Sequence, residues 1–273
     1  MEKRARTIII VTAILLAVIT VAIIGTTAMQ AIPANRVKRQ HQTEALTEQI
    51  TEVPVQPSAS GIASASVGEI ITFGAFEQDN NAANGAEEIE WQVLDRKDGR
   101  LPVISLYGLD CRQYNETYTF VTWETCSLRS WLNSDFYNTA FNESEKESIK
   151  TTTINNPDNA DYGTSGGNTT NDKVFCLSID EAKAYFGADS KDSNGNTINP
   201  YGAAKPTAYA VSMGAYADTP ADRYGMNCYW WLRSPGDNQS AAAGVNNRGN
   251  VIERGGHVNY GIYAVRPALW IEP

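Results

Sequence analysis

The chain contains few of the residues that usually carry catalysis. Its only histidines are His41 and His257. Histidine is the most frequent general base and a common metal ligand, so sites built from several histidines are excluded. His257 follows Gly255-Gly256, and the sequence places no plausible nucleophile beside it, which is typical of a polar loop residue. No spaced acidic cluster stands out either. We therefore predict a non-catalytic protein without metal or cofactor.

Four cysteines are the next residues that could do chemistry: Cys111, Cys126, Cys176 and Cys228. Outside the cytoplasm an even number of cysteines permits disulfides, and Cys111 with Cys126 is the best pair because it closes a short loop. The alternative is that the cysteines are small buried hydrophobic residues. Cys176, inside the apolar stretch 174–177, fits that alternative. Metal ligation is the weakest reading because no Cys-x-x-Cys spacing occurs.

A polar segment near the C-terminus, Asp237 to Tyr260, is rich in Asn, Gly and short side chains. Amide, guanidinium, imidazole and phenol groups offer the adaptable contacts of binding loops. We predict that the segment is a ligand-binding surface; the alternative is a set of solvated hairpin loops without a partner. The predicted contact residues are Asn238, Gln239, Asn246, Asn247, Arg248, Asn250, Glu253, Arg254, His257, Asn259 and Tyr260.

Apolar and basic stretches flank this segment, at 229–236 and 264–271. The tryptophans and arginines there could bind a sugar or an anion by ring stacking and guanidinium pairing. The preferred interpretation is structural, with buried scaffold residues. We expect Arg233 or Arg266 to pair with a buried acid or with backbone carbonyls. The predicted structural residues are Trp231, Arg233, Arg266 and Trp270.

The elements that must position these residues are predicted from periodicity and turn signals. Alternating apolar residues at 69–73 and 89–94, followed by 101–106 after Asp98-Gly99, predict an antiparallel meander. Helical spacing at 127–132, with a break at Asn133-Ser134, and the capping box from Ser178 to Glu181 predict short helices. Further strands are expected at 228–233, 241–245, 250–253 and 264–271. The fold class is therefore α+β, a mixed antiparallel sheet with two to four short helices and long loops. Because both ends are β, we expect them to come together.

The N-terminus predicts export. Three cations within residues 1–7 precede an uncharged run of about 18 residues, 8–25, which is near the minimum length for a transmembrane helix. We predict a single-pass signal-anchor in residues 1–29, with the basic end cytoplasmic, and a flexible or disordered linker in 30–66. Residues 67–273 form the extracytoplasmic globular domain. The alternative is a cleaved signal, with cutting near Ala28 or Ala31 and a secreted product.

The charge balance bears on partners. The formal net charge is -9, from 31 acidic against 22 basic residues. Nucleic-acid binding needs a basic surface to neutralise phosphates, so we predict no nucleic-acid partner. The predicted partners are the membrane, through residues 8–25, and an unidentified protein or glycan ligand.

Several short motifs, in order along the chain, resemble an uncharacterised bacterial family that is known only as a domain of unknown function and is often found on exported proteins. The matching stretches are 71–74 with 89–94, 122–129, 131–133, 172–175, 230–236 and 265–269. The resemblance covers about Val67 to Pro273.

The terminal pattern also looks like the end of C-type-lectin-like domains, which include formylglycine-generating enzymes and retroelement-diversified variable proteins. In the variable proteins an Asn-rich segment before the final strand binds ligand, and this resemblance implies the same for 237–260. The Glu-Pro-Asn or Gln-Pro-Asp triplet of calcium-dependent lectins is lacking, as is their later Trp-Asn-Asp. The formylglycine-generating enzymes depend on a cysteine pair near this region, where only Cys228 occurs.

We therefore expect a membrane-anchored, extracytoplasmic ligand-binding or display domain. Two alternatives stay open. One is an extracytoplasmic enzyme of the formylglycine-generating class, which requires a deep pocket at Cys228 and His257. The other is a structural protein of the cell envelope, for which the polar segment would be flat and featureless.

Overall fold

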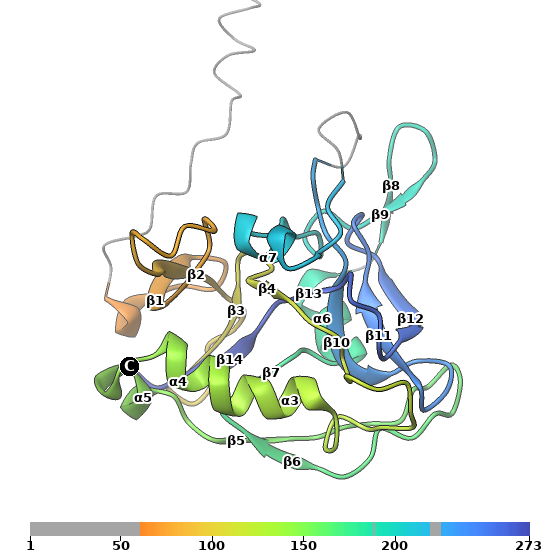
Figure 1. The fold of residues 1–273 in the computed structure, drawn as a ribbon, viewed down its shortest axis with the longest axis horizontal. Helices are drawn as coiled ribbons and strands as arrows, with labels where there is room; N and C mark the ends of the chain where they lie inside the picture. Colours follow the sequence, from red (N-terminus) through yellow and green to blue (C-terminus); the bar gives the residue numbers. More distant parts are fainter. Residues whose placement is uncertain (1–60, 188, 219–224) are drawn as a thin grey trace, which may run out of the picture. The chain divides into compact units, whose positions relative to one another are not determined.

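A computed structural model describes residues 61–187, 189–218 and 225–273, which belong to one compact unit, Val55–Pro273. Its first sheet starts as the predicted meander of β1 (Ile70–Phe76), β2 (Glu87–Val93) and β3 (Leu101–Ser105). The C-terminal strand β14 (Ala268–Ile271) pairs with β3, and β7 (Val174–Phe175) completes the order β1-β2-β3-β14-β7. Both ends of the domain therefore belong to one sheet, but the terminal strands do not pair with each other: β14 lies beside β3, and β2 and β3 separate it from β1 (Figure 1).

The second sheet carries the polar segment. Its strand order is β12-β11-β10-β13-β4, with β10 and β13 parallel and the other pairs antiparallel. The bounds are β4 (Asp110–Cys111), β10 (Trp230–Pro235), β11 (Ala241–Val245), β12 (Val251–His257) and β13 (Ala264–Val265). The strands predicted near 228–233, 241–245 and 250–253 are therefore present, but the single strand predicted over 264–271 is wrong: the chain divides there into β13 in the second sheet and β14 in the first. The two flanks of the polar segment lie in the core.

Two small hairpins were not predicted from the sequence. One joins β5 (Thr152–Ile154) to β6 (Thr170–Asp172), and the other joins β8 (Ser190–Lys191) to β9 (Thr197–Ile198). These strands have two or three residues each, too few to show an alternating pattern.

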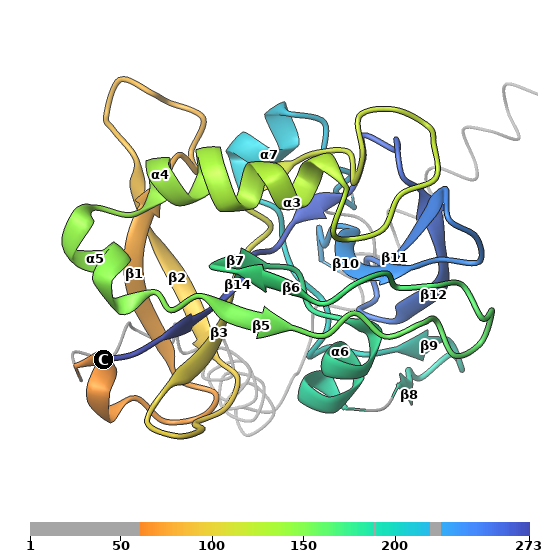
Figure 2. The same ribbon diagram turned by 90° about the horizontal axis from the view of Figure 1, so that it is seen from below.

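Short helices make up the remaining regular structure. Figure 2 shows α3 and α4 as parts of one helical run, joined by a π-helical turn, η2. The break predicted at Asn133-Ser134 is therefore wrong. Asn133 occupies this wider turn and binds β7, where its Oδ1 accepts hydrogen bonds from the N–H groups of Lys173 and Val174. The bounds are η1 (Ile62–Ser64), α3 (Ser127–Trp131), η2 (Leu132–Phe136), α4 (Tyr137–Ala140), α5 (Glu143–Ser148), α6 (Ile179–Phe186) and α7 (Ala208–Ser212).

The ends of these helices follow local sequence rules. The capping box predicted at Ser178 and Glu181 forms at the start of α6. Asn142 and Glu145 make a second capping box at α5. Each pair satisfies backbone N–H groups that the first helical turn would otherwise leave without partners.

The N-terminal prediction can be compared with the structure only at its C-terminal end. The expected anchor, 8–25, and residues 30–60 of the expected linker lie outside the described residues. Within the described part of the chain, no helix is long and apolar enough to cross a bilayer. Residues 62–64 already form η1, and Ala65 is fully buried. The flexible linker was therefore predicted to extend too far when its end was placed at residue 66.

Candidate functional site

The amides of the polar segment chiefly shape its turns. Oδ1 of Asn246 accepts hydrogen bonds from the backbone N–H groups of Arg248 and Asn250. Oδ1 of Asn238 accepts from the backbone and the hydroxyl of Ser240. Asn side chains close turns in this way by binding the backbone two residues on. These oxygens are thus engaged within the protein.

Other residues of the predicted surface contact neighbouring segments. Asn247 donates to both oxygens of Asp218 at 2.7 Å. Glu253 forms an ion pair with Lys183, and Arg254 forms one with Asp237 at 2.8 Å. The amide of Gln239 donates to the carbonyl of Val121. Such contacts hold the segment to the scaffold.

Asn250 corrects the expectation that the asparagines face outward. Its side chain is only 8 % exposed. Among the described residues its Nδ2 group has no hydrogen-bond partner. A buried amide cannot meet a ligand, so Asn250 is removed from the contact surface. Arg248, by contrast, is exposed at the tip of the β11–β12 turn, and its carbonyl accepts from the N–H of Asn199.

What the segment presents to solvent is an aromatic patch, which we define as Tyr118, His257 and Tyr260. The ring centroids of Tyr118 and His257 are 5.0 Å apart, and those of His257 and Tyr260 are 4.9 Å apart. Tyr118 is 57 % exposed and Tyr260 is 43 % exposed. Three adjoining exposed rings offer apolar faces for stacking, and their polar atoms can donate and accept hydrogen bonds.

Tyr118 comes from a loop that sequence reasoning did not connect with this surface. The loop 112–121 lies along the polar segment, and besides the bond from the Gln239 amide to Val121 three further hydrogen bonds join the two. The N–H of Asn115 donates to the carbonyl of Val258 at 2.8 Å, and the N–H of Val121 donates to that of Gln239 at 2.9 Å. The amide of Gln113 donates to the carbonyl of Asn259 at 2.8 Å. The only sequence signal in this loop was the aromatic run Tyr-x-Phe, which does not indicate that the loop lies beside the polar segment.

Buried aromatic rings pack beneath the aromatic patch. Tyr263 stacks on Trp231 with centroids 3.9 Å apart, and the indole N–H of Trp231 donates to the carbonyl of Arg112. A Cβ at Gly256 would lie 2.9 Å from the hydroxyl of Tyr263 and 3.1 Å from the ring of Tyr260. Glycine is therefore needed for both rings to pack on this strand. The patch is thus held by the core rather than by a loose loop.

The predicted structural residues are largely buried. Arg233 pairs with both carboxylate oxygens of Glu181 and donates to the carbonyls of Asn155 and Cys176, so the expected pairing is confirmed. Arg266 donates from Nε to the carbonyl of Ser105 at 2.7 Å. Trp270 is half-buried, with the guanidinium of Arg100 5.1 Å from its ring centroid.

Arg266 has a less complete environment than Arg233. In the described part of the chain it has no acidic partner, and its Nη1 has no hydrogen-bond partner. Its guanidinium lies 5.1 Å from the ring of Trp230 and 5.4 Å from that of Phe186. Burial lowers the pKa of Arg266 to about 10, because the apolar surroundings disfavour the charged form.

The predicted Cys111–Cys126 disulfide is wrong, because all four cysteines are buried free thiols. The Cys111 thiol points to the carbonyl of Gly261, whereas the Cys126 thiol donates to that of Trp123 and caps α3. Burial raises the pKa of Cys111, Cys126 and Cys228 to about 12 and also raises that of Cys176. These thiols are therefore protonated at neutral pH and are poor nucleophiles.

We expect fast maleimide or disulfide-exchange reagents to label these thiols very slowly at pH 8 in the folded protein. In denaturant all four should react within minutes, because unfolding removes burial and restores ordinary thiol pKa values. Labelling is counted by mass spectrometry without prior reduction. Two unlabelled cysteines in the denatured, unreduced protein would contradict the free-thiol assignment.

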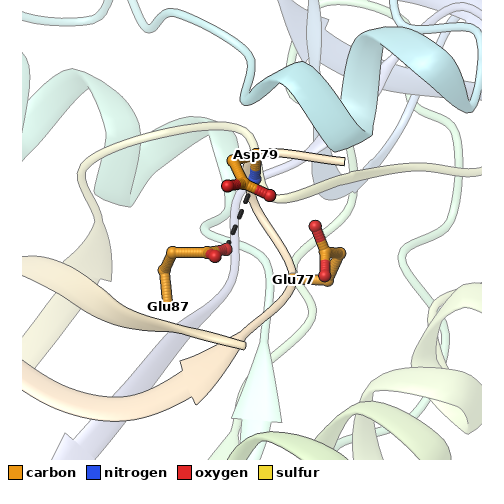
Figure 3. Close-up of side chains that lie close together, drawn as sticks. All are labelled: Glu77, Asp79 and Glu87. Atoms are coloured by element: carbon orange, nitrogen blue, oxygen red, sulfur yellow. Dashed lines mark hydrogen bonds between the residues drawn. The ribbon is translucent and has the colours of Figure 1, made fainter. Parts of the chain in front are cut away.

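An acidic group that sequence reasoning missed lies in the β1–β2 loop. Carboxylate oxygens of Glu77, Asp79 and Glu87 lie within 4.8 Å of one another (Figure 3). Hard cations such as Ca²⁺ take oxygen ligands of this kind. Oε2 of Glu87 already accepts from the N–H of Gln78 at 2.7 Å, and Asp79 accepts from the N–H of Asn81. The hydrogen bonds of the loop account for the cluster, and we assign it no metal.

The acidic group escaped notice because it depends on strand pairing. Glu77 and Asp79 follow β1, whereas Glu87 opens β2, and the register places Glu87 opposite Phe76. The separation of eight to ten residues in sequence contains no hint of this contact.

A comparison with protein families gives one match. A family model described as a domain of unknown function (DUF6273) matches residues 98–273. No curated protein and no solved structure matches the chain. The matched stretch begins in the turn before β3 and contains the aromatic patch and all four cysteines. It is shorter than the expected resemblance, which also included β1 and β2.

Proposed function

The chain belongs to the family defined by the domain of unknown function DUF6273, and from its geometry we propose a non-catalytic ligand-binding domain. The aromatic patch carries this proposal. Tyr118, His257 and Tyr260 adjoin one another, are exposed, and come from two segments fixed on the second sheet. Rigid aromatic side chains give a large contact area while losing little conformational entropy on binding.

The scaffold supports a finer proposal, a C-type-lectin-like arrangement. The C-terminal strand β14 joins the N-terminal meander through β3, and the patch lies in the stretch just before the final strands. A binding surface there leaves the buried sheets unaltered while its exposed side chains vary. The ligand in this proposal is a protein or a glycan, since both present faces on which exposed rings stack.

We further propose that the domain is held outside the cytoplasm on a single-pass anchor. The support comes from the sequence: the uncharged run 8–25 follows three cations, and a polar segment separates it from the folded domain. The net charge of -9 supports the proposal that nucleic acid is not a partner. The buried, protonated thiols weigh against the alternative of a formylglycine-generating type of oxidase.

The test is a double substitution, Tyr118→Ala with Tyr260→Ala. Ligands are first identified by screening the purified chain on glycan and protein arrays. We expect the double variant to bind an identified ligand at least about tenfold more weakly, because two stacking rings are lost from the contact surface. The melting temperature should be nearly unchanged, since both residues are exposed and neither belongs to the core.

Tyr201→Ala is the matched control, because Tyr201 is 76 % exposed and lies outside the patch. It should retain full binding to the same ligand. Equal binding by the double variant and the unaltered chain would place the ligand elsewhere and contradict the proposal.

A further inference from the structure

A cavity of about 280 Å³ is lined by residues from β4, from α3 and from the stretch that follows α7. Its volume is just below the range of about 300–1,000 Å³ typical of small-molecule sites, which favours a compact ligand. Opposite charges line it, from Arg112 and Glu116, and its apolar walls come from Leu128, Trp131 and Met213. Gly261, which follows Tyr260 of the aromatic patch, also borders it. Neither the predicted contact surface nor the proposed function includes this cavity.

Arg112 is held in a fixed position. Its Nε donates to the carboxylate of Asp110 at 2.9 Å, and Asp110 is fully buried. Its guanidinium carbon lies 4.1 Å from the ring centroid of Trp131. Within the described residues, Nη1 and Nη2 form no hydrogen bond. A guanidinium with both terminal nitrogens available can bind a carboxylate through two parallel hydrogen bonds.

Glu116 supplies the opposite charge. Its backbone N–H donates to the hydroxyl of Ser127, which fixes the start of its side chain on the cavity wall. Among the described residues, Glu116 and Arg112 form no ion pair within 4.0 Å, although they line the same cavity. The charges of Arg112 and Glu116 therefore do not neutralise each other in a direct ion pair. A ligand between them can satisfy both at once.

We propose that this cavity binds the zwitterionic head of an α-amino acid. The carboxylate meets Nη1 and Nη2 of Arg112, and the ammonium meets the carboxylate of Glu116. An apolar side chain of the ligand lies against Leu128, Trp131 and Met213. A peptide C-terminus offers the same carboxylate but no free α-ammonium. Only a free amino acid can therefore form an ion pair with Glu116.

The experiment is isothermal titration of the purified full-length chain with L-leucine and L-phenylalanine. Two analogues remove one charge each: leucinamide lacks the carboxylate and N-acetyl-leucine lacks the ammonium. We expect leucine to bind with a Kd of about 1 mM or lower, and each analogue to bind at least about tenfold more weakly. Equal binding of N-acetyl-leucine and leucine would show that the ammonium is not recognised. The ligand would then be a peptide C-terminus, and the zwitterion assignment would be overturned.

Two substitutions connect these preferences to residues. Glu116→Gln should weaken leucine binding and abolish the preference for leucine over N-acetyl-leucine. Arg112→Gln should abolish the preference for leucine over leucinamide. Because Arg112→Gln leaves the buried Asp110 without its partner and can impair folding, Glu116→Gln in an exposed position keeps the test decisive.

Arg254→Gln is the control, since Arg254 forms an exposed ion pair away from the cavity, and it should bind leucine normally. The absence of saturable binding at about 10 mM of either amino acid would overturn the proposal. So would leucine binding that is unaffected by both Glu116→Gln and Arg112→Gln. None of these variants alters the aromatic patch, so failure here leaves the proposed function untouched.

Discussion

Replacement of Arg233 by Met is expected to lower the free energy of unfolding by about 3–5 kcal/mol, because it breaks a buried charged network. The side chain of Arg233 is 3 % exposed. Its guanidinium binds the carboxylate of Glu181, the carbonyls of Asn155 and Cys176, and Oδ1 of Asn156. Methionine fills part of the volume but removes the guanidinium donors from these oxygens; among the described residues Glu181 keeps only the Ser178 N–H, and buried acceptors that lose a donor are costly.

The measurement is urea or guanidinium denaturation followed by tryptophan fluorescence. Arg254→Met is the matched control, because Arg254 also pairs with one acid, Asp237, but its side chain is 76 % exposed. An exposed pair contributes at most about 1 kcal/mol, so this control should change stability little. Similar losses in the two variants would show that the Arg233 network does not anchor the fold.

We expect Trp231→Ala to cost about 3–5 kcal/mol as well, through the cavity left by a large buried ring. Trp231 is fully buried between Tyr263, at 3.9 Å, and Tyr114, at 5.8 Å between ring centroids. Its indole N–H also donates to the carbonyl of Arg112 at 2.8 Å. The substitution removes ring contacts from the middle of the second sheet, where the surrounding strands cannot collapse easily.

Trp270→Ala provides the comparison within the same residue type. Trp270 is only half-buried, and the guanidinium of Arg100 covers part of its ring. Its replacement should cost clearly less than that of Trp231 in the same denaturation experiment. A larger loss for Trp270→Ala would contradict the view that Trp231 and its stacked partner Tyr263 support the aromatic patch.

The strands and capped helices of this protein could be predicted because their signals are local. Alternation places Ile89, Trp91 and Val93 on one buried face of β2. Ser178 and Glu181 form a capping box whose donors and acceptors lie within four consecutive residues. The buried character of Trp231 and Arg233 also follows from a continuous apolar stretch around them. Such local patterns can be recognised whatever the arrangement of the remaining chain.

The candidate site could not be predicted in the same way. Its composition pointed to the segment 237–260, but the sequence could not separate the amides that close turns from the rings that face solvent. By residue type, Asn246 and Asn250 both resemble contact residues. In the folded β11–β12 turn, however, Asn246 accepts backbone hydrogen bonds and Asn250 is buried. Exposure depends on what packs above a residue, and this is not encoded in its type.

The sequence alone indicated the α+β class, β-structure on both sides of the polar segment and the buried role of Trp231, Arg233 and Arg266. Only the tertiary structure decided that Tyr118 joins His257 and Tyr260, that Arg112 and Glu116 share a cavity, and that Cys111 and Cys126 point apart. The physical reason is the separation in sequence between the residues that interact. Secondary structure arises from neighbours within a few residues, whereas Gln113 and Asn259, whose hydrogen bond joins the two segments that carry the aromatic patch, are 146 residues apart. Contacts at that separation form only when both sheets have packed.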